Sequence, residues 1–168
     1  MTAENIAFKR VLVPHVKANY QSERENGFKR VFDNDSQFSY VFKKKGMWKD
    51  VEDLDHQIVE VRMREPGMRH PSTLTSMANL AVTYFHQGKY EEARELGLKV
   101  LDLCKNVLGP EHPDTLISMA NLAYTYSHQG KYEEAGERQV KVLDLHEKIL
   151  GAEDPDTLIS MGHFARTY

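Results

Sequence analysis

Histidine is frequent enough in this sequence to raise the question of a metal site. The chain has 168 residues, of which 8 are histidines. His70 and His112 are spaced by the same interval as His86 and His128, so these histidines are spread along the chain. Zinc requires three or four ligands at one place, and the sequence has neither a His-Glu-x-x-His motif nor paired Cys-x-x-Cys motifs. We therefore predict no metal site, and we expect these histidines to cap or end helices.

Carboxylates occur in pairs that could serve calcium binding or acid catalysis. The pairs are residues 91–92, 133–134 and the two aspartates of "DPD" at 154–156. All of them fall where helices are expected to begin, and carboxylates there stabilise the helix dipole. The sequence also lacks the Gly-x-x-x-x-Gly-Lys-Ser/Thr phosphate motif and any recognisable pairing of a nucleophile with a base. We predict no catalytic residue, no cofactor and no enzymatic activity.

A single cysteine, Cys104, excludes an internal disulfide framework and favours a reducing compartment. It lies in the apolar-periodic run "VLDLCKNVL", where a buried thiol is expected. No apolar run reaches the roughly 18 residues needed to span a membrane, and the amino terminus has no signal-peptide pattern. We predict a cytoplasmic protein with no membrane partner.

Charge is distributed unevenly along the chain. Residues 1–49 carry a net charge of +5, and residues 50–168 carry −8. Basic clusters such as "KKK" at 43–45 are not accompanied by any zinc-finger spacing or aromatic RNA-binding pattern. We interpret them as solvated surface and predict no nucleic-acid partner.

The elements that must position any functional residue form an internal repeat. The stretch "SMANLAVTYFHQGKYEEA" at 76–93 returns at 118–135 with two changes, Val82 to Tyr124 and Phe85 to Ser127. The period is 42, and 28 of the 40 residues in 70–109 are identical to those in 112–151. Such periodicity is typical of stacked units that each need a neighbour to bury their apolar face.

The repeat divides the chain into an amino-terminal segment and an array. Residues 1–35 are expected to form a short helix interrupted near Pro14 and a polar linker. The array covers 36–168, and its parts are a degenerate unit at 36–69, full units at 70–111 and 112–153, and a half unit at 154–168.

Each unit is expected to contain two helices. In the third unit, Pro113 suits a first helical turn, His112 is a candidate N-cap (as is Asp154 in the next unit) and Gly130 ends the helix. Apolar residues spaced by three and four predict one buried stripe, made of Leu116, Met119, Leu122, Ala123 and Tyr126. For the second helix, the expected inner residues are Tyr132, Ala135, Val142, Leu145 and Ile149. The array is therefore predicted to be an all-α stack of helix pairs.

The repeat resembles a known family. The spacing Leu-Ala-x-x-Tyr followed by Gly-Lys-Tyr-x-x-Ala, at 80–93 and 122–135, is similar to the tetratricopeptide repeat. Its 42-residue period resembles the long repeats of kinesin light chains and of fungal NB-ARC receptor-like proteins. The resemblance implies a right-handed superhelical solenoid of antiparallel helix pairs that works as a scaffold or adaptor for other proteins.

A ladder of polar residues marks the candidate binding face. Asn79 and Asn121 are one period apart and are continued by His163. When helix pairs stack, the first helices line a concave channel, and asparagine there can bond a peptide backbone; in the resembling family, asparagine at this place commonly contacts the bound peptide. An alternative role is to tie neighbouring units together. The predicted groove residues beside the ladder are Val82, Tyr124, Arg166, Phe85 and Ser127.

Three interpretations therefore remain open from the sequence. The first is a scaffold that binds an extended peptide segment of another protein. The second is a structural or self-association element: either a fragment of a larger repeat protein, or a chain of which two copies form a homodimer through the apolar carboxy-terminal helix. The third is an enzyme or nucleic-acid binder, which the missing motifs disfavour.

Overall fold

The computed structural model describes residues 46–165, and the chain divides into two compact units, 1–54 and 55–168. The described part of the first unit contains Gly46, which has a positive φ of 67°, and the beginning of α3 (Trp48–Arg62). Three of its apolar side chains, those of Met47, Val51 and Leu54, are buried. The predicted amino-terminal helix near Pro14 and the linker lie outside the described residues.

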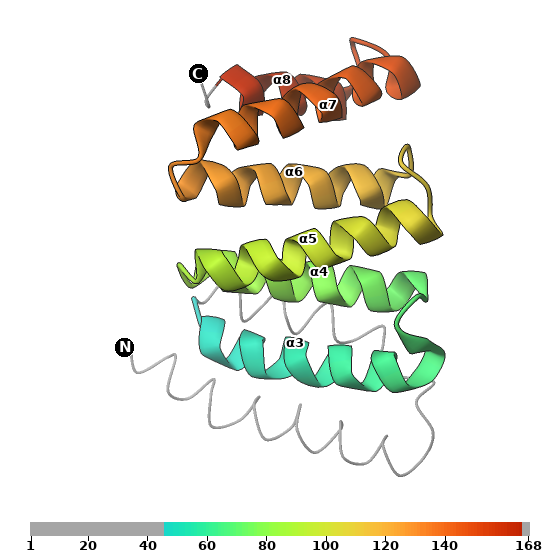
Figure 1. Ribbon diagram of the computed structural model, residues 1–168, viewed down its shortest axis with the longest axis vertical. Helices are drawn as coiled ribbons and strands as arrows, with labels where there is room; N and C mark the ends of the chain where they lie inside the picture. The colour runs from blue at the N-terminus through green and yellow to red at the C-terminus, as the bar shows by residue number, and fades with distance from the viewer. Residues whose placement is uncertain (1–45, 166–168) are drawn as a thin grey trace. The chain divides into compact units, whose positions relative to one another are not determined.

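The second compact unit, which starts at Asp55, is built from helices alone within its described range, 55–165 (Figure 1). After the remainder of α3 and a π-helical turn, η1 (Met63–Gly67), five helices follow. They are α4 (Pro71–His86), α5 (Tyr90–Val107), α6 (Pro113–His128), α7 (Tyr132–Leu150) and α8 (Pro155–Ala165). Consecutive helices run antiparallel and contact one another, and α4 also contacts α6. The prediction of an all-α stack of helix pairs is confirmed.

The three described first helices, α4, α6 and α8, begin in the same way. The His112 Nδ1 atom accepts a hydrogen bond from the backbone N–H of Asp114, and Asp154 Oδ1 accepts one from Asp156. His70 caps α4 as His112 caps α6, and proline follows each cap. His86 and His128 are the last residues of α4 and α6. The expected capping and terminating roles of these histidines are confirmed.

Glycines at fixed positions turn the chain between paired helices. Gly88 and Gly130 follow α4 and α6 with φ of 76° and 74°, a conformation that costs other residues energy. Gly46, one period earlier, has a similar φ of 67°. The degenerate unit therefore keeps the turn geometry of the complete units at this point.

The core consists of the stripes predicted on the first helices. All five expected stripe residues of α6 are buried. Ala123 of α6 and Ala135 of α7, small residues on the expected inner sides of the pair, are both fully buried at 0% exposure. Because both are buried between paired helices, we expect a larger side chain at either position to force the helices apart.

Two predicted inner residues of α7 are exposed, so that part of the prediction was wrong. Tyr132 is 59% exposed and Ile149 is 44% exposed. Both lie at the ends of α7, which has 19 residues against 16 in α6. Tyr90, the counterpart of Tyr132, lies against the Phe85 ring at 5.5 Å, whereas Ser127 replaces that ring in the next unit. The buried face of α7 is formed by Ala135, Gly136, Gln139 and Val142.

Candidate functional site

A cavity of about 250 Å³ opens between α4, α5 and α6. It brings together four of the predicted groove residues, Val82 and Phe85 from α4 with Asn121 and Tyr124 from α6. The other lining residues are Ala81, His86, Ala93, Gly97, Leu122 and Thr125. Because none of these is Asp, Glu, Lys or Arg, the cavity is mainly apolar, and Asn121 and Thr125 supply polar groups in its wall.

The remaining predicted residues lie around this cavity or outside the described part of the chain. Asn79 is exposed on α4, one period before Asn121, and does not line the cavity. Ser127 is half-buried, and its hydroxyl has no hydrogen-bond partner among the described residues. His163 belongs to α8, but its side chain lies outside the description, as does all of Arg166.

An aromatic cluster stands beside the cavity. The Phe85 ring lies edge-on to His128 at 4.7 Å and to Tyr124 at 6.4 Å between ring centroids. His128 also stacks on Tyr124 at 6.2 Å and contacts Tyr90 at 5.7 Å. The two positions at which the repeated stretch changes, 82/124 and 85/127, therefore supply the two rings that meet across the joint between units.

Sequence reasoning missed Tyr90 and His128 as members of this cluster. Both belong to the repeated letters "HQGKY", which we interpreted only as the end of one helix and the start of the next. An alignment of the units shows equivalent residues, but it does not show that Tyr90 of one unit meets His128 of the following unit. Stacking of the units brings them together.

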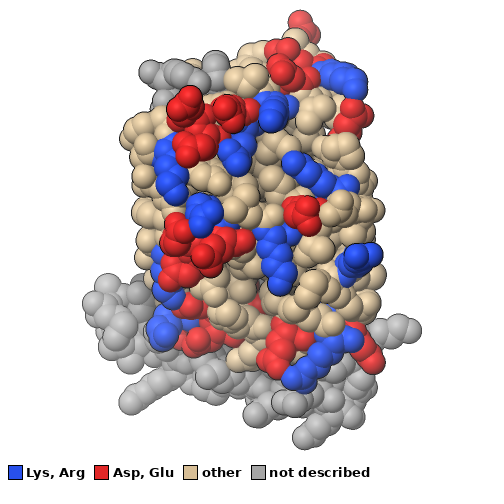
Figure 2. All heavy atoms as spheres, viewed as in Figure 1, with Lys and Arg blue, Asp and Glu red and all other residues tan. Residues whose placement is uncertain are grey.

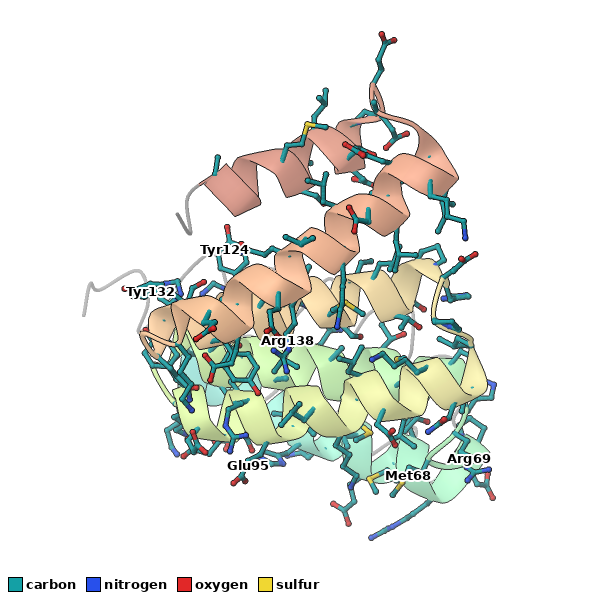
Figure 3. All side chains as sticks on the ribbon, turned by 45° about the horizontal axis from the view of Figure 1, so that its top comes forward. Met68, Arg69, Glu95, Tyr124, Tyr132 and Arg138 are labelled. Carbon is teal, nitrogen blue, oxygen red and sulfur yellow. The ribbon has the colours of Figure 1, made fainter. Side chains whose placement is uncertain are left out.

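Charged side chains surround Tyr126 on the other side of α6. The Arg138 guanidinium lies 4.4 Å from the centre of the Tyr126 ring, a cation–π contact, and Figure 3 shows Arg138 beneath α7 on the side of α5. Arg94 of α5 forms an ion pair with Glu91, and Glu91 also accepts a hydrogen bond from Gln129 at 2.9 Å. The hydrogen bond from Arg94 holds the pKa of Glu91 below its usual range. These contacts join α5, α6 and α7.

A second set of contacts repeats at every joint between units. A serine one turn into α4, α6 and α8 bonds a residue on the preceding second helix: Ser76 with Arg62, Ser118 with Cys104 and Ser160 with His146. The serines are 42 residues apart, but the side chain that each one bonds differs from joint to joint. Cys104 is buried as predicted, and burial raises the pKa of its thiol.

The described residues contain no group of three or more His, Cys, Asp or Glu side chains placed to hold a metal ion. Within 46–165, none of the helices is both long enough and apolar enough to cross a membrane. On the face shown in Figure 2, Lys and Arg alternate with Asp and Glu, and no large surface of one sign is present.

Comparison with protein-family models finds a tetratricopeptide repeat at residues 36–103, 77–139 and 121–168. No match was found among curated protein sequences. One similar crystal structure is of a Podosopora anserina protein described as a kinesin light chain with nearly identical TPR-like repeats, with 30% identity and a TM-score of 0.76. The match covers 81% of this chain and 64% of that chain, so this chain spans less than two thirds of its length.

Two further structures are similar at 16% identity and show the fold alone. BtubC (BKLC) from P. vanneervenii matches with a TM-score of 0.77 over 93% of this chain and 64% of that chain. The apo form of RapI matches with a TM-score of 0.70 over 98% of this chain and 60% of that chain. The right-handed TPR-like solenoid expected from the sequence is confirmed, and the similarity to fungal NB-ARC receptor-like proteins stays a prediction. The chain belongs to the tetratricopeptide repeat family, and its repeats are similar to those of the kinesin light chain-like structure.

Proposed function

We propose that this protein is an interaction scaffold that binds an extended peptide segment of a partner along the face formed by α4 and α6. The observation that carries the proposal is the apolar cavity of about 250 Å³, because residues of this predicted face line it. Concave apolar sites with a few polar groups are the usual form of ligand sites. The family supports interaction with other proteins in general.

Asn79 and Asn121 are the proposed contacts to the peptide backbone. Asn79 is exposed and Asn121 is half-buried at the edge of the cavity. A carboxamide offers two donors and an acceptor, which match the N–H and C=O groups of an extended chain. Apolar side chains of the peptide would then face Val82, Phe85 and Tyr124.

The proposal can be tested by selecting peptides from a displayed random library against the whole chain. The selected peptides should bind the double variant Asn79→Ala, Asn121→Ala at least about tenfold more weakly, since each lost hydrogen bond costs about 1 kcal/mol. The melting temperature should change by only a few degrees.

A matched control for this experiment is Asn106→Ala, which removes an exposed asparagine from α5. It should leave peptide binding unchanged. A double variant that loses several kcal/mol of stability and binds peptides normally would instead assign the two asparagines to contacts between units.

Self-association through α8 is a second candidate, and the exposure of Leu158 favours it. Leu74 and Leu116 hold the same position in α4 and α6 and are 2% and 3% exposed, but Leu158 is 54% exposed. Burying such a side chain against a second copy stabilises a dimer by about 25 cal/mol per Å². Sedimentation should then show a dimer that Leu158→Asp dissociates. A wild-type chain that stays monomeric at high concentration would exclude this candidate.

We also infer a cytoplasmic location, because the single cysteine is a buried free thiol, which a reducing compartment preserves.

A further inference from the structure

One position in the repeat holds a different residue at each of three joints. Counted in steps of 42, Asp55 of α3 is followed by Gly97 of α5 and Gln139 of α7. At the first joint, Asp55 is 3% exposed and its Oδ2 accepts a hydrogen bond of 2.6 Å from Thr83 Oγ1 of α4. The protein's own carboxylate therefore fills this place at the first joint.

Glutamine fills the corresponding place on α7. Gln139 is 7% exposed and lines a cavity of about 10 Å³ together with Tyr124 of α6 and Ser160 of α8. That volume is close to the minimum for a single water molecule.

The middle joint has no side chain at this position. Thr125, the counterpart of Thr83, bonds the Asn121 carbonyl oxygen at 3.0 Å and lines the cavity of about 250 Å³ together with Gly97. A Cβ atom at Gly97 would lie 3.3 Å from Leu122 Cδ1, so even alanine would press on the cavity wall. Glycine in the middle of a helix costs about 0.5–1 kcal/mol relative to alanine, and here it leaves space between three helices.

The wall of the cavity determines what can enter. Aliphatic and aromatic groups from Ala81, Val82, Phe85 and Leu122 cover much of it, and none of the lining residues is Asp, Glu, Lys or Arg. A carboxylate or ammonium group entering it would lose hydration without an opposite charge. Because an apolar protein cavity of about 150 Å³ already accommodates benzene, this one is large enough for a phenyl-sized group.

We propose that Gly97 is the specificity-determining residue of the binding face: the cavity above it receives one uncharged apolar side chain of the bound peptide, about the size of a phenyl ring. At the other two joints the equivalent position carries a buried side chain, that of Asp55 or Gln139, and the proposal concerns the middle joint, whose cavity is lined by described residues. The inference rests on the proposed peptide-binding function for its ligand, but the cavity can be tested without a peptide.

Toluene is a suitable probe, and the methyl NMR signals of Val82 and Leu122 report its entry. Toluene should shift these signals in the wild-type chain, and benzoate should not. The variants Gly97→Gln and Gly97→Asp copy the residues of the other joints, and each should weaken toluene binding at least about tenfold. Glu95→Gln, on an exposed position of the same helix, should bind toluene as the wild type does.

Folding of the variants is checked by melting. Gly97→Asp places a carboxylate among apolar groups with only the Thr125 hydroxyl to bond it, so it should melt below the wild type, and the uncharged Gly97→Gln should melt closer to the wild type. Gly97→Ala adds one methyl group, which occupies part of the cavity, and should weaken toluene binding by a few fold. This variant still tests the inference if the two larger variants unfold. Absence of toluene binding to the wild type, or equal binding to all Gly97 variants, would overturn the inference.

Peptide selection separates this inference from the proposed function. Selected peptides should share one uncharged apolar residue and should bind Gly97→Gln at least about tenfold more weakly. If selected peptides depend on Asn79 and Asn121 but not on Gly97, the peptide-binding function stands and the specificity role is wrong. If toluene binds as expected and no peptide is selected, the cavity stands and the peptide-binding function is wrong.

Discussion

Single positions decide how closely neighbouring helices approach, and Gly97, Ala123 and Ala135 show two different outcomes. The two alanines are fully buried between α6 and α7. Gly97 lies at a joint where the facing helices leave a cavity. Small residues in this fold therefore either permit close packing or leave space for a ligand, according to what lies opposite.

Replacement of Ala135 by leucine tests the close-packed case. The larger side chain would be forced into a contact that has no room, so we expect a loss of about 1–3 kcal/mol in the free energy of unfolding. Urea denaturation gives this value directly. Val140→Leu, at an exposed position of α7, should cost less than about 0.5 kcal/mol of the free energy of unfolding. Equal effects of the two substitutions would contradict the packing argument.

Cys104 should react slowly with thiol reagents in the folded chain. It is 1% exposed, it lies 3.8 Å from Ser118 Oγ, and burial raises the pKa of its thiol, so less reactive thiolate is present near neutral pH. The rate of alkylation by iodoacetamide should rise strongly in urea. Rapid alkylation under native conditions, at a rate equal to that of the unfolded chain, would show that the α5–α6 joint opens readily.

At the scale of the helices, a polar link adds to the aromatic contacts where α5 begins and α6 ends. Glu91 lies in the first turn of α5 and accepts hydrogen bonds from Arg94 and from Gln129, the residue that follows α6. The link therefore joins the start of α5 to the end of α6. Its contribution depends on the charge of Glu91 and should fall at high salt.

The pH dependence of this link has a definite sign. The folded chain lowers the pKa of Glu91, chiefly through the hydrogen bond from Arg94. The stabilisation is therefore fully present above the ordinary glutamate pKa of about 4.3 and is lost as the pH falls through the lower, folded value. Glu91→Gln should melt below the wild type at pH 7, and the difference should shrink below about pH 4. Glu92→Gln removes the same charge from the same turn and should not show this pattern.

The last helix is expected to open most easily of α4–α8. α8 has 11 residues, its Leu158 is exposed, and the buried Thr157 hydroxyl has no hydrogen-bond partner among the described residues. Thr73 and Thr115, its counterparts, donate to the carbonyl oxygens of Gly67 and Gly109 at 2.8 Å. Amide exchange in α8 should be the fastest of these helices, unless a dimer covers it. Strong protection of α8 in a monomer would contradict this expectation.

At the scale of the whole molecule, periodicity accounts for how much of the fold was predictable. The 42-residue period and the apolar stripes led correctly to the helix pairs, their caps and the family. The candidate site was predictable only in part. Val82, Phe85, Asn121 and Tyr124 share a face that the period reveals, but the cavity among them depends on Gly97, which belongs to the other helix of the pair. Alignment of the two full units shows the change from Gly97 to Gln139 as one difference among several. It gives no indication of the cavity between the helices.

Near-identity of neighbouring units also has a consequence for how the chain reaches its fold. Twelve of 40 aligned positions differ between residues 70–109 and 112–151, and eight of these lie in the second helices, α5 and α7. A folding chain could pair α4 with α7 in place of α5, because α4 and α6 are nearly alike, and such wrong pairing is a characteristic failure of repeat proteins. At three of these aligned positions α5 has Arg94, Leu96 and Gly97, and α7 has Gly136, Arg138 and Gln139. The second helices thus give each unit an identity that opposes wrong pairing, and a chain in which α7 carries the sequence of α5 should fold more slowly and exchange helices between molecules.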